Sequence, residues 1–104
     1  MFVYHIVLPD VWEEAKNNDS YAADSLAAEG FIHCSYEHQL DAVLGRYYSA
    51  KKVVILKLNT AKLTSELVEE PSTNNEIYPH IYGSINLDAV TSVEERDLTA
   101  DARG

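Results

Sequence analysis

The sequence predicts a single small domain of the α+β class. Its 104 residues suffice for one domain, and 46% of them are hydrophobic, which is ordinary for a globular protein. Helical patterns gather in the first half of the chain and strand-like runs in the second, whereas a repeating βαβ protein would alternate them throughout. We expect residues 1–98 to form the globular domain and residues 99–104 to be a disordered tail.

The first thirty residues predict a strand followed by two helices. Residues 2–8 (FVYHIVL) form a continuous apolar run, which is typical of a strand buried on both faces. Asp10 and Glu13 have the spacing of a capping box at the start of a short helix. Residues 20–29 are alanine-rich with apolar side chains at helical spacing, and Gly30 stands where a left-handed residue would end the helix.

The remaining elements follow from the same two periodicities. Residues 31–34 predict a second strand, and residues 36–49 predict an amphipathic helix, because apolar side chains repeat there at helical spacing. One helical turn is expected at residues 60–63, and residues 71–76 (PSTNNE) are the most turn-like segment of the chain. Strand-like runs fill the second half, at residues 52–58, 66–70, 80–87 and 90–98.

Charge and cysteine content narrow the class of ligand. The net charge of −9 argues against a broad phosphate-contacting surface, so neither nucleic acid nor an anionic membrane is expected as a partner. A small pocket for a phosphorylated ligand remains open, because it needs only one or two donors. The single cysteine, Cys34, allows no intramolecular disulfide, so a reducing cytoplasm is the expected location. No signal peptide is visible, and no run approaches the roughly 18 apolar residues of a membrane helix.

The stretch GFIHCS, residues 30–35, brings three reactive side chains together. His33 and Cys34 lack the tight pair spacing of zinc ligands and would point to opposite faces of a strand, so we expect no metal site. Free cysteine is among the most buried residue types, which favours a core thiol over a nucleophile at Cys34. Ser35 precedes a predicted helix, so we expect its hydroxyl to cap that helix, with contact to a ligand as the alternative.

Histidines inside apolar strands are harder to explain by packing. His5 interrupts FVYHIVL and His33 interrupts GFIHCS, and a buried imidazole must have its nitrogens satisfied. One such residue is usually a hydrogen-bonded core histidine, but two on separate strands suggest that both rings face one cleft. His80 adds a third, and Glu70 ends a predicted strand, where it is either solvated or a candidate general base. Seven tyrosines are a high count for this length, and several are expected to line a pocket.

Four blocks of the sequence together resemble a known family. They are YHI at 4–6, SLAAEGFIHCS at 25–35, the glutamate-proline at 70–71 and YPHIYG at 78–83. This combination resembles a family of small bacterial proteins catalogued as domain of unknown function 952, over residues 3–95 or so. The resemblance implies a remote similarity to the ADP-ribosyltransferase-like fold, including its RNA 2′-phosphotransferase branch. Members of that fold bind NAD between two small sheets, so the resemblance implies a split, curved, mostly antiparallel sheet with two or three helices.

The resemblance also implies catalytic roles. His5 resembles the histidine or arginine that holds the NAD ribose in this fold. Residues 33–35 resemble the His-Leu-Ser block of the phosphotransferases, with Cys34 in place of the leucine, so His33 is the second catalytic candidate. The third motif falls on Glu70 or on His80, and the match does not choose between them.

Three further residues are implied as ligand-binding. Ser35 belongs to the second motif, and Tyr82 is placed to stack on nicotinamide or adenine. Arg46 is the only central arginine available to a pyrophosphate. The chain lacks the basic cluster of the best-known members, which weakens the NAD hypothesis and weakens RNA as a substrate further.

The leading hypothesis is therefore a small cytoplasmic protein that uses NAD or an ADP-ribose-like nucleotide in glycosyl or phosphoryl transfer. Its polar cleft would be lined by His5, His33, His80 and Tyr82. One rival is a non-catalytic module on the same fold that binds a small ligand or a protein. Another is purely structural, with the histidines as hydrogen-bonded core residues. The sequence leaves open the substrate, the reaction, whether the protein is an enzyme, and the oligomeric state.

Overall fold

The computed structural model describes residues 1–99, apart from the side chain of Thr73. This part of the chain forms three small sheets and three α-helices, so the predicted α+β class is confirmed. Every strand pairing within it is antiparallel. Of the tail expected at residues 99–104, all but Thr99 lies outside the described residues.

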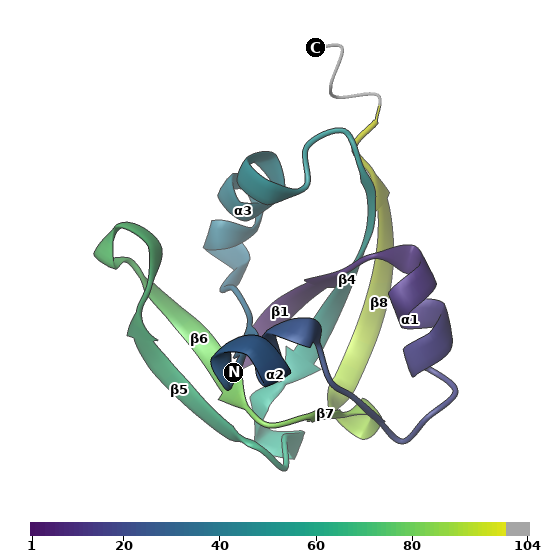
Figure 1. Ribbon diagram of the computed structural model, residues 1–104, viewed down its shortest axis with the longest axis vertical. Helices are drawn as coiled ribbons and strands as arrows, with labels where there is room; N and C mark the ends of the chain where they lie inside the picture. The colour runs from purple at the N-terminus through teal and green to yellow at the C-terminus, as the bar shows by residue number, and fades with distance from the viewer. Residues whose placement is uncertain (100–104) are drawn as a thin grey trace.

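The first sheet is built on the central strand β4 (Lys52–Asn59), which pairs with β1 (Phe2–Val7) on one side and β8 (Val90–Asp97) on the other. Strand β4 is rich in β-branched and aliphatic residues and is buried at most positions, whereas β8 is an exposed edge strand. Strand β1 is also mostly buried, as its continuous apolar run predicts. It lies at the edge of the sheet that faces the rest of the chain (Figure 1).

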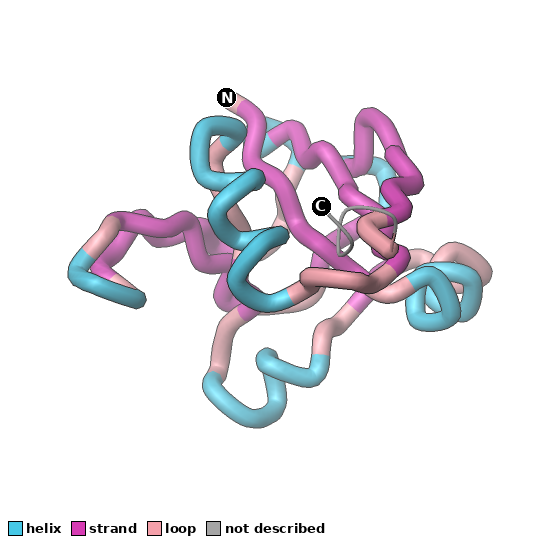
Figure 2. The backbone as a smooth tube through the Cα atoms, turned by 90° about the horizontal axis from the view of Figure 1, so that it is seen from above, coloured by secondary structure: helices cyan, strands magenta, loops and turns pink. Residues whose placement is uncertain are grey.

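The second sheet has the order β3-β6-β5, from β3 (Ile32–His33), β6 (Ile77–Tyr82) and β5 (Glu66–Pro71). Strands β5 and β6 form a hairpin that projects from the rest of the molecule (Figure 2). Its turn holds Asn74 and Asn75 in left-handed conformations, with φ of 58° and 61°, which asparagine tolerates better than most residues. The turn-like composition of residues 71–76 is therefore confirmed as a hairpin turn.

A single bridge joins the two larger sheets. The backbone N–H of Tyr4 donates to the carbonyl of Ser35 at 2.8 Å, and the N–H of Ser35 donates back to Tyr4 at 2.7 Å. These bonds use the edge of β1 just beyond β3, so His5 and His33 are brought close together. The helix cap expected at Ser35 is wrong, because Ser35 is fixed by this pairing and the following 3₁₀ turn, Glu37–Gln39, begins after Tyr36.

The structure differs from two sequence predictions at a third, two-stranded sheet. Strand β2 (Ser20–Tyr21) pairs with β7 (Ile85–Asn86), so the helix predicted from residue 20 begins only at Asp24. The strand predicted over residues 80–87 is split, because β6 ends at Tyr82 and the chain turns at Gly83 before joining β2. A Cβ at Gly83 would stand 2.4 Å from the Ser65 hydroxyl, so this turn needs a residue without a side chain.

The three helices are short and flank the sheets (Figure 1). Helix α1 (Pro9–Ala15) begins with proline at its first position and has no side-chain cap, so the expected capping box is wrong. Proline suits that position because its missing N–H would have no partner there. Helix α2 (Asp24–Glu29) ends at Gly30 with φ of 89°, which confirms the left-handed C-terminal residue. None of the described helices is long and apolar enough to cross a membrane.

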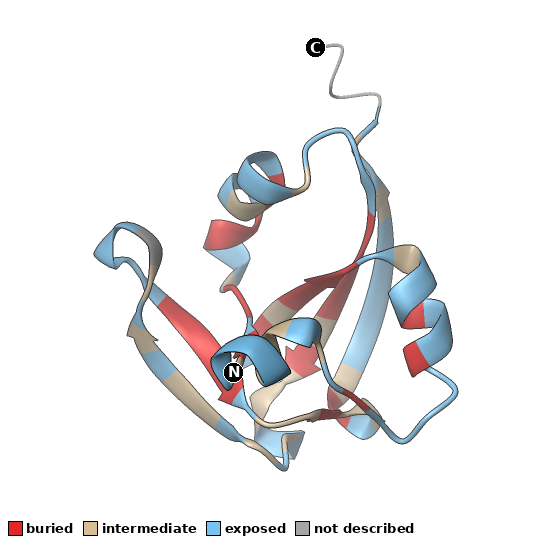
Figure 3. Cartoon of the chain, viewed as in Figure 1, coloured by how far each residue is buried: buried red, intermediate tan, exposed pale blue. Residues whose placement is uncertain are grey.

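Helix α3 (Leu40–Tyr47) packs beside β1 and is the last of the elements that surround this strand. It buries Leu40 and Leu44 in a small cluster with Ile6 and Ile55, in agreement with the amphipathic pattern of residues 36–49. A larger cluster fills the space between the sheets and under α1, and the buried segments of β1, β4 and β6 meet there (Figure 3). The two clusters lie on opposite faces of the first sheet, which leaves the outer edge of β1 as the place where a pocket forms.

Candidate functional site

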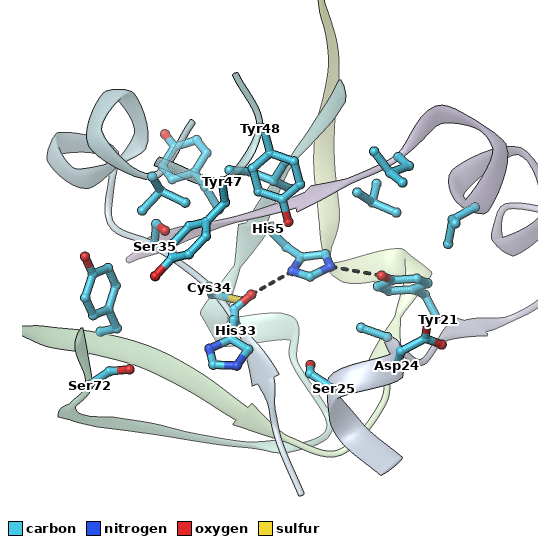
Figure 4. Close-up of a pocket in the computed structure, with 18 of the residues that line it drawn as sticks. His5, Tyr21, Asp24, Ser25, His33, Cys34, Ser35, Tyr47, Tyr48 and Ser72 are labelled. Carbon is cyan, nitrogen blue, oxygen red and sulfur yellow. Dashed lines mark hydrogen bonds between the residues drawn. The ribbon is translucent and has the colours of Figure 1, made fainter. Parts of the chain in front are cut away.

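A pocket of about 560 Å³ opens where β1, β3, α2 and the end of α3 meet (Figure 4). This volume lies within the range of small-molecule sites, roughly 300–1,000 Å³. Five of the seven tyrosines line it, as their high count suggested. The tyrosines are Tyr4, Tyr21, Tyr47, Tyr48 and Tyr78.

His5 stands at the centre of this pocket with both ring nitrogens engaged. Its Nδ1 lies 2.7 Å from the carbonyl oxygen of His33, so Nδ1 carries the proton and donates it. Its Nε2 is therefore a bare acceptor, and the Tyr21 hydroxyl donates to it at 3.0 Å. Burial lowers the pKa of His5 to about 4, in spite of the hydrogen bond to His33, so the ring is neutral at pH 7.

Tyr21 holds its proton firmly in this arrangement. Burial raises the pKa of the Tyr21 phenol most, and the charge interactions with Tyr48 and then with Asp24 raise it further. A protonated phenol that donates to His5 keeps its oxygen lone pairs free to accept a hydrogen bond. The pair His5–Tyr21 therefore presents an acceptor to the pocket, while the imidazole itself is shielded from proton transfer.

His33 contributes its backbone to His5 but turns its ring away. The His33 carbonyl points to His5 in Figure 4, while the imidazole points in the opposite direction. Half of the side chain is exposed, and Nε2 lies 2.9 Å from the Glu29 carboxylate one helical turn earlier. His5 and His33 thus share one pocket, as their strands suggested, but the two rings do not face each other.

Cys34 and Ser35 lie at the back of the pocket, on the side of β1. Cys34 is 4% exposed and packs in the main core, which confirms it as a core thiol. Burial raises its pKa, so the thiol is protonated and is a poor nucleophile. Ser35 is also buried, and it lines the pocket, which leaves the alternative of contact with a ligand.

The end of α3 supplies the opposite wall. Arg46, Tyr47 and Tyr48 lie on its last turn and just beyond it, and Tyr78 on β6 closes the same side. The Arg46 guanidinium carbon lies 5.6 Å from the centre of the Tyr47 ring. Hydrogen bonding with Tyr78, and then with Tyr47, raises the pKa of Arg46 above its usual value. Arg46, singled out from the sequence, is therefore a residue of the pocket.

His80, Glu70 and Tyr82 form a separate cluster on the second sheet. His80 Nδ1 lies 2.7 Å from Glu70 Oε1, and the Tyr82 hydroxyl donates to the same oxygen. These two donors, Tyr82 first, lower the pKa of Glu70. The Phe31 ring stacks on His80 with 4.2 Å between ring centres. His80 is only 2% exposed, and its Nε2 is buried without a hydrogen-bond partner.

The structure therefore divides the predicted site. His5, His33, Ser35 and Arg46 line the pocket, whereas His80, Glu70 and Tyr82 are not among the described residues that line it. The two groups meet at His33, whose ring centre is 5.3 Å from that of His80, its direct partner across β3 and β6. The expectation that His80 and Tyr82 line the same cleft as His5 is corrected, because Phe31 covers this end of the sheet.

Several pocket residues escaped the sequence prediction. Tyr21, Tyr48 and Asp24 had no motif to mark them, and only the number of tyrosines hinted at an aromatic lining. Tyr21 was placed inside a helix, which concealed its hydrogen bond with His5. Within residues 1–99, no three His, Cys, Asp or Glu side chains come together in a way that could hold a metal ion.

Fold and pocket define the class as a small antiparallel α+β domain with a tyrosine-rich pocket of about 560 Å³. The chain belongs to the family described as "Protein of unknown function (DUF952)", whose family model matches residues 6–93. This confirms the family resemblance, and the matched residues contain the EGFIHCS and PHIYG blocks. No curated protein matches the chain.

Solved structures of one bacterial protein share this fold. The crystal structure of protein CC0527 from Caulobacter crescentus is 26% identical, with a TM-score of 0.88 over 98% of this chain and 91% of that one. A double mutant of CC0527 gives a TM-score of 0.87 at 25% identity, with the same coverage. Its solution NMR structure gives 0.83 at 26% identity, over 97% of this chain and 89% of that one.

Proposed function

We propose that the protein binds a nucleotide of the NAD or ADP-ribose class in the pocket around His5 and acts on it by glycosyl or phosphoryl transfer. The observation that carries the proposal is the pocket itself, with tyrosines around a neutral, hydrogen-bonded His5. Tyrosine rings stack on flat heteroaromatic bases, and their hydroxyls bond to ribose. The resemblance of the sequence to the ADP-ribosyltransferase-like fold supports the same ligand class.

His5 would act on the ribose through Tyr21. Because the phenol donates to Nε2, a ribose hydroxyl can donate to the phenol oxygen and complete a short chain of hydrogen bonds. The neutral imidazole orients this chain, since its other nitrogen is anchored to the carbonyl of His33. Loss of nicotinamide leaves a positively charged, oxocarbenium-like ribose, which a nearby carboxylate stabilises. Asp24 is the carboxylate that lines the pocket.

His80 is the proposed base of the transfer step. A carboxylate on Nδ1 fixes the tautomer and leaves Nε2 as a proton acceptor, and Glu70 provides this contact at 2.7 Å. His80 lies directly across from His33, which lines the pocket. A ligand that extends over His33 would therefore contact the Phe31 ring that stacks on His80. Rotation of Phe31 would then admit the acceptor hydroxyl, whose proton passes to Nε2 while its oxygen bonds to the ribose carbon from which nicotinamide leaves.

A binding module without turnover is the second candidate, and one observation favours it. Both nitrogens of His5 are taken up by protein groups, and Nε2 of His80 is buried under its neighbours. Among the described residues that line the pocket, this leaves the half-exposed ring of His33, held by Glu29 at Nε2, and the carboxylate of Asp24 as the imidazole and carboxylate groups that could exchange a proton. Such a site can hold a nucleotide without changing it.

Calorimetry and a turnover assay separate these candidates. NAD and ADP-ribose are titrated into the wild-type protein, and release of nicotinamide from NAD is followed by chromatography. Binding with nicotinamide release supports the transferase, whereas binding without release supports the module. His33→Ala should weaken binding, and His38→Ala is the matched control, because His38 is exposed and does not line the pocket. Absence of heat with both nucleotides at millimolar concentration would refute the proposed ligand class.

A further inference from the structure

The pocket carries one fixed charge of each sign. Among the residues that line it, Arg46 is the only lysine or arginine and Asp24 is the only aspartate or glutamate. This balance differs from that of the whole chain, which has 17 acidic and 8 basic residues. Within the described residues, neither side chain belongs to an ion pair at 4.0 Å or less. The tyrosine contacts of Arg46 leave its charge unbalanced, so both charges can attract a ligand of opposite charge.

The two charges lie on different walls. Asp24 is the first residue of α2 and lies beside Tyr21 on one side of His5 (Figure 4). Arg46 lies in the last turn of α3, and its neighbour Tyr47 is on the other side of His5 in the same view. His5 between them is neutral, so the pocket has a positive end, an uncharged aromatic middle and a negative end.

The Arg46 end is suited to one oxyanion. A guanidinium group presents five N–H donors in a planar fork, which matches two oxygens of a phosphate or carboxylate. Tyr78, which interacts with Arg46, helps to position the fork at the pocket wall. Among the described residues, the pocket lining holds no second arginine or lysine, so a second phosphate of a pyrophosphate would lack a cationic partner in it.

The Asp24 end is suited to a flat cation. Tyr21 lines the pocket next to the Asp24 carboxylate, and the two are close enough for the charge of Asp24 to act on the phenol. An aromatic ring beside a carboxylate favours a positively charged heteroaromatic group, through cation–π attraction together with Coulomb attraction. A neutral base gains only the stacking contribution.

We propose that the pocket is selective for a zwitterionic mononucleotide, with the phosphate at Arg46 and a cationic aromatic base at Asp24 and Tyr21. Nicotinamide mononucleotide is the simplest compound of this kind, and it is one half of NAD. The selectivity rests on the proposed function, because it names the part of the NAD class that this site recognises. NAD would be bound through this half, with its second phosphate and adenosine reaching out of the pocket.

Calorimetry with three small ligands tests each end separately. Nicotinamide mononucleotide has both charges, nicotinamide riboside has only the cation, and AMP has only the phosphate. Arg46→Gln should weaken the binding of the mononucleotide and of AMP by about tenfold and leave the binding of the riboside unchanged. Asp24→Asn should weaken binding of the mononucleotide and of the riboside by about threefold and leave AMP unchanged, because an exposed carboxylate attracts the cation by charge alone, without the paired hydrogen bonds that Arg46 offers a phosphate.

Matched variants control for general charge effects. Arg96→Gln removes an arginine from β8, and Asp10→Asn removes an aspartate from the first turn of α1, and neither residue lines the pocket. Both should bind all three ligands as the wild type does. Equal effects of Arg46→Gln on the riboside and on AMP, or tighter binding of AMP than of nicotinamide mononucleotide to the wild type, would overturn the selectivity. NAD and ADP-ribose are run in parallel. If they bind while the charge pattern fails, only the selectivity is wrong, and if no nucleotide binds, the proposed function is wrong as well.

Discussion

Replacement of His5 should remove a defined part of the pH dependence of folding. The neutral ring is anchored by His33 and Tyr21, and its pKa in the folded protein is about 4, compared with 6.5 for a free histidine. Between these two values the unfolded chain binds a proton that the folded chain rejects. The contribution is therefore complete above pH 6.5, and stability is lost as the pH falls from 6.5 towards 4.

The size of this loss follows from the two pKa values. At pH 5, a group with pKa 6.5 is almost fully protonated and a group with pKa about 4 is almost fully neutral. Linkage between protonation and folding then gives a loss of about 2 kcal/mol between pH 8 and pH 5. In His5→Gln the residue at this position no longer titrates, so its free energy of unfolding should fall by about 2 kcal/mol less over the same interval.

Urea unfolding at the two pH values measures this difference. The wild type, His5→Gln and His38→Gln are compared, the last as the control for removal of an exposed histidine outside the pocket. Contributions from the carboxylates and the other histidines cancel when the pH effect in the variant is subtracted from that in the wild type. An equal loss of stability in wild type and His5→Gln would refute the conclusion that His5 is held neutral.

Two further predictions concern packing. Gly83→Ala should destabilise the fold by roughly 1–3 kcal/mol, since its Cβ would lie 2.4 Å from the hydroxyl of Ser65, whereas Gly45→Ala in α3 meets open space and should stabilise by roughly 0.5–1 kcal/mol. Urea unfolding checks both, and similar effects at the two positions would contradict the steric account. Cys34 should not react with a disulfide reagent in the native state and should react fully in urea, because it is buried and its pKa is raised. Rapid labelling of the native protein would show that the thiol is accessible.

Local patterns were sufficient for the elements that obey one periodicity. The β-branched run of β4 and the left-handed Gly30 were both predictable, because each depends on its own residues. Strand β2 was not, because its two residues are extended only through pairing with β7, more than sixty positions away. The split between β6 and β7 likewise depends on the close approach of Gly83 to Ser65.

The candidate site was predictable only as far as residue types mark it. Histidines inside apolar strands singled out His5 and His33 correctly as pocket residues. The sequence could not show that the His33 carbonyl accepts the hydrogen bond of His5, since that contact depends on the bridge between Tyr4 and Ser35. The cover of Phe31 over His80 is also a contact between residues far apart in the sequence, and it separates two groups that the prediction had placed in one cleft.

Amide chemical-shift mapping tests the central claim most directly. NAD and ADP-ribose are titrated in turn into ¹⁵N-labelled protein up to millimolar concentration. The account predicts saturable shifts at His5, at His33 to Ser35 and at the end of α3, with β8 unaffected because none of its residues lines the pocket. No shift at His5 or His33 with either nucleotide, or saturable shifts confined to β8, would contradict the proposal that this pocket is a nucleotide site.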